Sequence, residues 1–134
     1  MVYYTLMITG TLIASLVMVG QKCKLGHTYD AHAKQLTPRI VRNLVSRAKP
    51  NYRETQLRAM EVIAKKESTY RVNERDPRST AYGLYGFLNS TWRGTGIPKS
   101  DCPTCQTQAA LKYVEKRYGS PEKALVFHRK HGWY

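Results

Sequence analysis

The chain has 134 residues, enough for one modest domain, which excludes a multidomain architecture. Its 22 Lys and Arg residues against 9 Asp and Glu residues give a formal net charge of +13. That excess favours an anionic partner, such as nucleic acid, an anionic membrane face or a cell-wall polymer, and charge alone does not choose among them.

The N-terminal stretch differs from the rest, because residues 2–20 carry no charged side chain. A helix of that length would be about 28 Å long, close to the hydrocarbon core of a bilayer. The alternatives are a cleaved signal peptide and a buried hydrophobic helix. No basic residue precedes the run, and it is longer than the apolar part of a usual signal peptide. We therefore expect a retained membrane helix over residues 1–22, followed by a polar linker over residues 23–36.

Apolar residues at helical spacing predict a helix over residues 37–50. Thr37 is a suitable N-cap, Pro38 suits the first turn, and Pro50 ends the segment. The apolar face consists of Ile40, Val41, Leu44 and Val45.

A second helix is expected to start at Asn51, which forms a capping-box-like pair with Glu54. Its apolar stripe consists of Leu57, Met60, Ile63 and Ala64. Continuing the stripe by three residues reaches Glu67, so this carboxyl is expected at the edge of the buried face. Burial raises the pKa of a carboxyl, and a carboxylic acid that stays protonated near neutral pH can act as a general acid. The alternative is a structural glutamate satisfied by a backbone amide or an arginine.

The remaining segments are expected to be loops and helices. Turn-forming residues predict loops over 69–81 and 93–104, with a turn and helix start within 82–92. Residues 105–119 predict a helix that Gly119 ends, and residues 120–134 open with Ser120 as N-cap and Pro121 in the first turn. No strand pattern of any strength is present, so the fold class is mainly α.

Several segments together resemble one family. They are "ES" at 67–68, "STAYGLYGFLNSTW" at 79–92 and "ALKYVEKRYGSPEKALVFHRKHGWY" at 110–134. In this order they resemble the lytic transglycosylase domain of the goose-type lysozyme superfamily, with small phage and virion-associated members the most similar. The core of the resemblance covers residues 51–134, and the domain would span residues 37–134.

The resemblance implies a lysozyme-like α fold with a glycan cleft. It also implies cleavage of the β-1,4 bond between N-acetylmuramic acid and N-acetylglucosamine, with no metal or other cofactor. Glu67 matches the family's general acid, which then acts as base on the muramyl 6-hydroxyl; the alternative is a lysozyme-like muramidase, in which water ends the reaction. The positions that match the family's substrate-binding segments are Ser68, Tyr82, Gly83, Leu84, Tyr85, Tyr113, Phe127 and His128.

Two positions depart from the family pattern. Gly86 stands where relatives commonly carry Gln, and His128 stands where they carry Asn. Both departures leave substrate positioning open. The rings of Tyr82, Tyr85 and Tyr113 are expected either to lie along sugar rings or to pack in the core.

The expected partners are peptidoglycan glycan strands, anionic wall polymers, and a bacterial or virion membrane through residues 2–20. The chain would then be membrane-anchored and virion-associated, or face the periplasm and wall, and would open the wall locally during phage entry or exit. Lys22 and Lys24 follow the apolar run and favour a cytoplasmic body. This conflict between a cytoplasmic orientation and a wall substrate is weaker if a virion carries the protein into the envelope, because the flanking charges would then not determine its orientation.

Other functions and sites stay open. One alternative is a basic, membrane-anchored DNA-delivery protein, although no nucleic-acid-binding motif is present; another is a wall-binding protein whose catalysis has decayed. Cys102 and Cys105 with His128 and His131 have spacings that a zinc site could use. A local disulfide or two free thiols is the alternative, and we expect no bound metal.

Overall fold

The computed structural model describes residues 34–134. The expected membrane helix over residues 1–22, and the expected linker up to residue 33, lie outside the described residues. The described part is mainly α, as the sequence predicts. Its helices are α2 (Pro38–Ala48), α3 (Glu54–Ser68), α4 (Asn89–Thr95), α5 (Pro103–Tyr118) and α6 (Pro121–His131). Within residues 34–134, no helix combines the length and apolar character needed to cross a bilayer.

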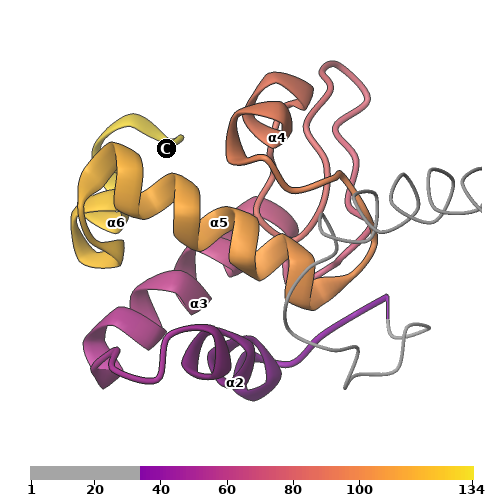
Figure 1. Cartoon of the computed structure of the whole chain (residues 1–134). Coiled ribbons are helices and arrows are strands. Elements are labelled where there is room, and N and C mark those ends of the chain that lie inside the picture. The colour runs from indigo at the N-terminus through magenta and orange to yellow at the C-terminus, as the bar shows by residue number, and fades with distance from the viewer. Residues whose placement is uncertain (1–33) are drawn as a thin grey trace, which may run out of the picture.

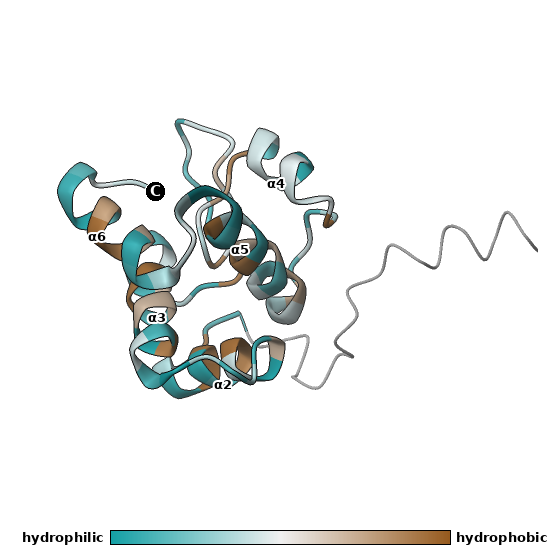
Figure 2. Cartoon of the chain, turned by 60° about the vertical axis from the view of Figure 1, so that its left-hand side comes forward, coloured by the Kyte–Doolittle hydropathy of each residue, from teal (hydrophilic) through white to brown (hydrophobic). Residues whose placement is uncertain are grey.

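Helix α5 runs through the middle of the fold (Figure 1). It packs against α2, α4 and α6, while α3 packs against α2 and α6. Figure 1 shows α2 and α3 on one side of α5 and α4 on the other. The apolar faces of the helices turn toward one another (Figure 2), and one core cluster joins them. Its fully buried members include Val41, Val45, Met60, Ile63, Ala110 and Val114.

The predicted N-terminal caps of α2 and α6 are confirmed. The Thr37 side chain accepts a hydrogen bond from the Ile40 amide at 3.3 Å, and the Ser120 side chain accepts one from the Lys123 amide at the same distance. In both helices a proline follows the cap, where its missing N–H costs no helical hydrogen bond. Gly119 ends α5 with a φ of 79°, in the left-handed region that glycine enters without strain.

The predicted start of α3 is wrong. The Tyr52 amide donates to the Lys49 carbonyl at 3.0 Å, which holds residues 49–52 in a turn. The helix therefore begins after this turn, with Arg53 as the N-cap residue. The Gln56 side chain accepts from the Arg53 amide at 3.0 Å, in place of the expected pair between Asn51 and Glu54.

The other helices also differ from the prediction at their ends. Helix α4 continues to Thr95, and α5 begins at Pro103, so the expected loop over 93–104 is shorter. Cys102 caps α5, with its sulfur accepting from the Cys105 amide at 3.3 Å. Residues of the long segment between α3 and α4 form only isolated bridges, and no strand occurs within residues 34–134.

Residues 34–36 belong to the folded part rather than to a linker. The Leu36 amide donates to the Tyr70 carbonyl at 2.9 Å, and the Val72 amide donates to the Lys34 carbonyl at 3.0 Å. Leu36 is buried in the core. The folded part therefore includes residues before position 37, the domain boundary that the sequence predicted.

Gln106 of α5 holds the long segment between α3 and α4 in place. Its side chain is buried and makes three hydrogen bonds. The Oε1 atom accepts from the Leu84 amide at 2.7 Å, and Nε2 donates to the carbonyls of Val72 and Ser100 at 2.7 and 2.8 Å. Three backbone groups from two loops are thus satisfied by one side chain, as buried polar groups require.

We predict that Gln106→Leu destabilises the fold strongly. Apolar replacement leaves three buried backbone groups without their partner, and each unsatisfied group costs about 1–3 kcal/mol. The free energy of unfolding, measured by denaturant titration, should fall by about 3 kcal/mol or more. Gln108→Leu makes the same change at a half-buried position of the same helix and is the matched control. Equal losses in the two variants would contradict this role of Gln106.

Candidate active site

The C-terminal end of α3 positions Glu67 as the sequence predicts. Met60, Ile63 and Ala64 are fully buried, and Glu67 follows on the same stripe. The Glu67 side chain is 21% exposed, so its carboxyl lies at the edge of the core and solvent still reaches it. Burial raises the pKa of Glu67 above its ordinary value and outweighs the lowering effects of His128 and Lys66.

His128 of α6 is the direct partner of this carboxyl. Its Nε2 lies 2.6 Å from Oε1 of Glu67, which joins residues 61 positions apart. The imidazole is buried, and its Nδ1 has no hydrogen-bond partner within residues 34–134. When Glu67 is ionised, Nε2–H can donate to the carboxylate. When Glu67 is protonated, the acid can donate to Nε2 instead, so the pair can accommodate both states of the acid.

Gly86 provides the space for the carboxyl. Its φ of 63° lies in the left-handed region, and a Cβ built on this residue would lie 2.5 Å from Oε2 of Glu67. Any side chain at this position would collide with the carboxyl unless one of them moved. The glycine at position 86 therefore has a local structural reason, since the Glu67 carboxyl occupies the space that a side chain would fill.

Ser68 and Leu84 fix the segment that carries Gly86. The Ser68 hydroxyl lies 2.8 Å from the Leu84 carbonyl and 3.0 Å from the Ala64 carbonyl, and it donates to these backbone oxygens. Ser68 is 4% exposed and Leu84 is fully buried. Both were predicted to bind substrate, but the structure encloses both side chains. Their observed role is to hold the turn at residues 82–87 against the end of α3.

The rings of Tyr82 and Tyr85 pack in the core, the second of the two arrangements that the sequence left open, because both side chains are buried. Tyr85 is 2% exposed, its hydroxyl lies 3.4 Å from that of Thr107, and its pKa is raised by burial. Tyr82 contacts Asp101 through its hydroxyl, and burial together with that carboxylate raises its pKa to about 12. A Cβ on Gly83 would meet the Gln106 amide at 3.0 Å, so this glycine also serves close packing.

The other two predicted substrate-binding residues lie outside this group of contacts. Tyr113 is half-buried on α5 and packs on Phe87 with ring centroids 5.0 Å apart. Phe127 on α6 is half-buried and contacts the rings of His131 and Trp133 at 4.2 and 4.9 Å. The structure thus joins Glu67, His128 and Gly86 directly.

Sequence reasoning assigned no role to Tyr134, which lies beside this group. Its hydroxyl donates to the Tyr85 carbonyl at 3.0 Å, and its ring centroid lies 5.9 Å from that of His128. Burial and the nearby charge of Glu67 raise its pKa well above 10. The final "GWY" belongs to the family-like tail, and that was the only available signal for this residue.

The zinc alternative finds no support in the arrangement of its ligands. His128 is bonded to Glu67, whereas the Cys102 and Cys105 sulfurs lie 2.8 Å apart at the start of α5. Residues 34–134 contain no group of three or more His, Cys, Asp or Glu side chains that could hold a metal ion.

Comparisons of the chain with known protein families, characterised proteins and solved structures find no match. The chemistry that the site can perform is therefore argued from its geometry. The Glu67 carboxyl is partly exposed and has a raised pKa, which suits acid–base chemistry.

We predict that His128→Phe raises the pKa of Glu67 further. The hydrogen bond and charge of His128 both lower that pKa, and phenylalanine fills the site without a donor. A pH titration of the Glu67 carboxyl by ¹³C NMR would measure the change. His131→Phe, at an exposed position of the same helix, should leave it unchanged. An unchanged or lower Glu67 pKa in His128→Phe would contradict the assigned partnership.

A second prediction concerns Gly86→Ala. The new methyl group should displace the Glu67 carboxyl, weaken its bond to His128 and so change the pKa of Glu67 in the same titration. Gly96→Ala is the matched control, because Gly96 has a similar φ of 70° but nothing within 4 Å of a built Cβ. Both variants carry the strain of a left-handed alanine, about 1–2 kcal/mol. Only Gly86→Ala should alter the acid, and equal titrations in the two variants would refute the contact.

Proposed function

We propose that the chain is a peptidoglycan lytic transglycosylase with a lysozyme-like α domain that includes residues 34–134. The observation that carries this proposal is the carboxyl of Glu67, which is partly exposed, has a raised pKa and is bonded to His128. The order of the motifs around it, and the helical fold, support the same assignment. Anionic wall polymers suit the net charge of +13.

In the proposed reaction, protonated Glu67 donates its proton to the glycosidic oxygen as the bond from muramyl C1 to that oxygen breaks. The N-acetyl oxygen of the muramyl residue assists by bonding to C1. The Glu67 carboxylate then removes the proton of the 6-hydroxyl, whose oxygen attacks C1 and displaces the N-acetyl oxygen. The products are a free 4-hydroxyl and a 1,6-anhydro ring, Glu67 is protonated again, and no water is consumed.

A mechanism with one carboxyl is supported by the partners of the other acids. Within residues 34–134, every other carboxylate contacts a group other than Glu67. Each of these Asp and Glu side chains forms a hydrogen bond or an ion pair: Glu54 with Arg58, Glu61 with Arg42 and Tyr70, Glu74 with Arg71, Asp76 with Ser79, Asp101 with Tyr82, Glu115 with Lys49 and Tyr52, and Glu122 with Thr55. His128 would stabilise the Glu67 carboxylate between the two proton transfers through its Nε2–H.

The cellular setting belongs to the same proposal. Residues 2–20 would anchor the chain in a bacterial or virion membrane, with the basic domain facing peptidoglycan. Local wall opening during phage entry or exit would use such an arrangement. The membrane helix lies outside the described residues and rests on the uncharged run alone.

We predict that Glu67→Gln abolishes turnover while the fold remains intact. Glutamine cannot deliver the proton, and positioned acid–base help is worth about 10²–10⁴-fold. The loss in release of soluble muropeptides should reach or exceed that range. Mass spectrometry of wild-type digests should find 1,6-anhydro ends. Glu54→Gln, at an exposed position of the same helix, should keep wild-type activity. Near wild-type turnover in Glu67→Gln would contradict the proposed role of Glu67 as the general acid.

The same variant has a stability signature. A carboxyl whose pKa is raised by folding penalises the fold once pH exceeds its unfolded value, and the penalty is complete above the folded pKa. Glu67→Gln removes this penalty, so its stability at pH 7 should equal or exceed that of the wild type. The advantage should shrink as the pH falls from the raised pKa of folded Glu67 toward the ordinary value of a carboxyl, and it should be absent below that value.

A further inference from the structure

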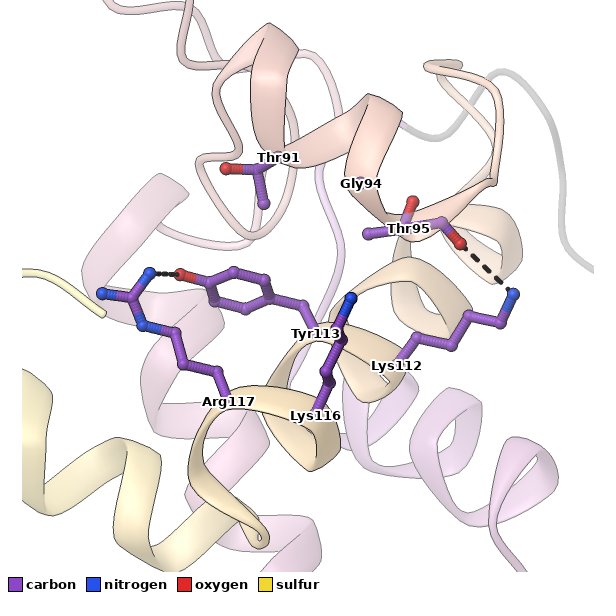
Figure 3. Close-up of a pocket in the computed structure, with 7 residues that line it drawn as sticks. All are labelled: Thr91, Gly94, Thr95, Lys112, Tyr113, Lys116 and Arg117. Carbon is purple, nitrogen blue, oxygen red and sulfur yellow. Dashed lines mark hydrogen bonds between the residues drawn. The ribbon is translucent and has the colours of Figure 1, made fainter.

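A pocket of about 590 Å³ lies between α4 and α5 (Figure 3), and its lining includes none of Glu67, His128 and Gly86. It is lined by Thr91, Gly94 and Thr95 of α4 and by Lys112, Tyr113, Lys116 and Arg117 of α5. Figure 3 shows the α5 side chains reaching from their helix toward α4. The volume falls within the range of small-molecule sites, about 300–1,000 Å³, and exceeds what a single small ion needs.

The lining carries three cationic side chains and no carboxylate. The Lys112 Nζ donates to the Thr95 carbonyl at 3.2 Å, and the Arg117 guanidinium donates to the Tyr113 hydroxyl at 2.8 Å. Lys116 forms neither a hydrogen bond nor an ion pair within residues 34–134. Glu115, the nearest acid in sequence, is bonded instead to Lys49 and Tyr52. The positive charge in the pocket is therefore not neutralised by its own lining.

Aromatic rings hold one of these cations in place. Arg117 lies over the rings of Tyr113, Tyr118 and Trp133, at 5.7, 5.6 and 5.3 Å from their centroids. Its contacts fix the guanidinium beside the Tyr113 hydroxyl without using a carboxylate. The pocket thus combines a positioned guanidinium, two ammonium groups and one half-buried ring face, which together suit an anionic group attached to a larger apolar or sugar body.

The pocket is linked to the candidate active site by an aromatic wall. The ring of Tyr113 packs on that of Tyr134 with centroids 5.7 Å apart, and Tyr134 packs in turn against His128. A polymer that entered the pocket would contact Tyr113, whose ring packs on Tyr134 beside His128.

We propose that this pocket binds an anionic substituent of the wall glycan, a carboxylate or a phosphate, while Glu67 acts on the chain that carries it. This inference rests on the proposed function for the identity of the polymer. The pocket chemistry itself is that of an anion site with room for a sugar. Lys116 is the pocket residue expected to contact the anion most directly, because its ammonium group need not break a hydrogen bond or ion pair within residues 34–134 to do so.

The test measures binding by the full-length chain in a Glu67→Gln background, so that turnover does not consume the probes. The probes are a peptidoglycan glycan fragment with free carboxylates, the same fragment with those carboxylates amidated, and poly(glycerol phosphate). Lys116→Gln is compared with Lys123→Gln, which makes the same charge change at an exposed position of α6. Lys112→Gln is a second pocket variant, and circular dichroism checks the fold of each.

Lys116→Gln should weaken binding of an anionic probe by about tenfold, the loss expected for one charge-assisted hydrogen bond. A loss with the carboxylated fragment that disappears on amidation identifies a carboxylate, and a loss with poly(glycerol phosphate) identifies a phosphate. Equal losses in Lys116→Gln and Lys123→Gln, or none in either pocket variant, would overturn the inference. Failure of wild-type turnover alongside a pocket-specific loss would instead refute only the proposed function.

Discussion

The contact that the candidate site depends on is the hydrogen bond between Glu67 and His128. It links the end of α3 to the last turn of α6, two helices that also pack against each other. The two effects on the acid oppose one another, because burial raises its pKa while His128 lowers it. Burial is the larger effect. A deeper carboxyl would lose access to a substrate, and a more exposed one would lose its raised pKa. The observed depth, with 21% of the side chain exposed, allows both properties.

The segment that faces this acid is positioned by side chains from elsewhere rather than by a sheet. The Leu84 amide donates to the Gln106 side chain of α5, and the Leu84 carbonyl accepts from the Ser68 hydroxyl of α3. The Tyr85 carbonyl accepts from Tyr134 at the C-terminal end. Buried loop backbone needs such partners, because it lacks the regular ladder of a helix or strand. Three separate parts of the chain therefore determine where Gly86 lies, and hence how much room the Glu67 carboxyl has.

Local sequence signals predicted the local features well. Thr37, Ser120 and Gly119 act at helix ends as expected, and the apolar stripe of α3 was sufficient to place Glu67 at the edge of the core. Features that depend on distant contacts were not predictable in this way. The pairing of Glu67 with His128 requires knowing how α3 meets α6, and the burial of Tyr85 requires knowing what covers it. An aromatic side chain has the same sequence signature whether it faces a ligand or the core. The start of α3 was missed because a turn at residues 49–52 displaced the cap.

The strong positive charge of the chain makes the burial of Glu67 chemically important. A carboxyl surrounded by cations ordinarily loses its proton more readily, and Lys66 acts on Glu67 in that direction. An exposed glutamate in this protein would therefore be a poor proton donor near neutral pH. Placing the carboxyl at the edge of the core reverses that tendency locally, because desolvation penalises the ionised form more than the nearby positive charge favours it. The basic surface can then attract an anionic polymer over a distance of about one Debye length, roughly 8–10 Å, without removing the proton that the proposed chemistry needs.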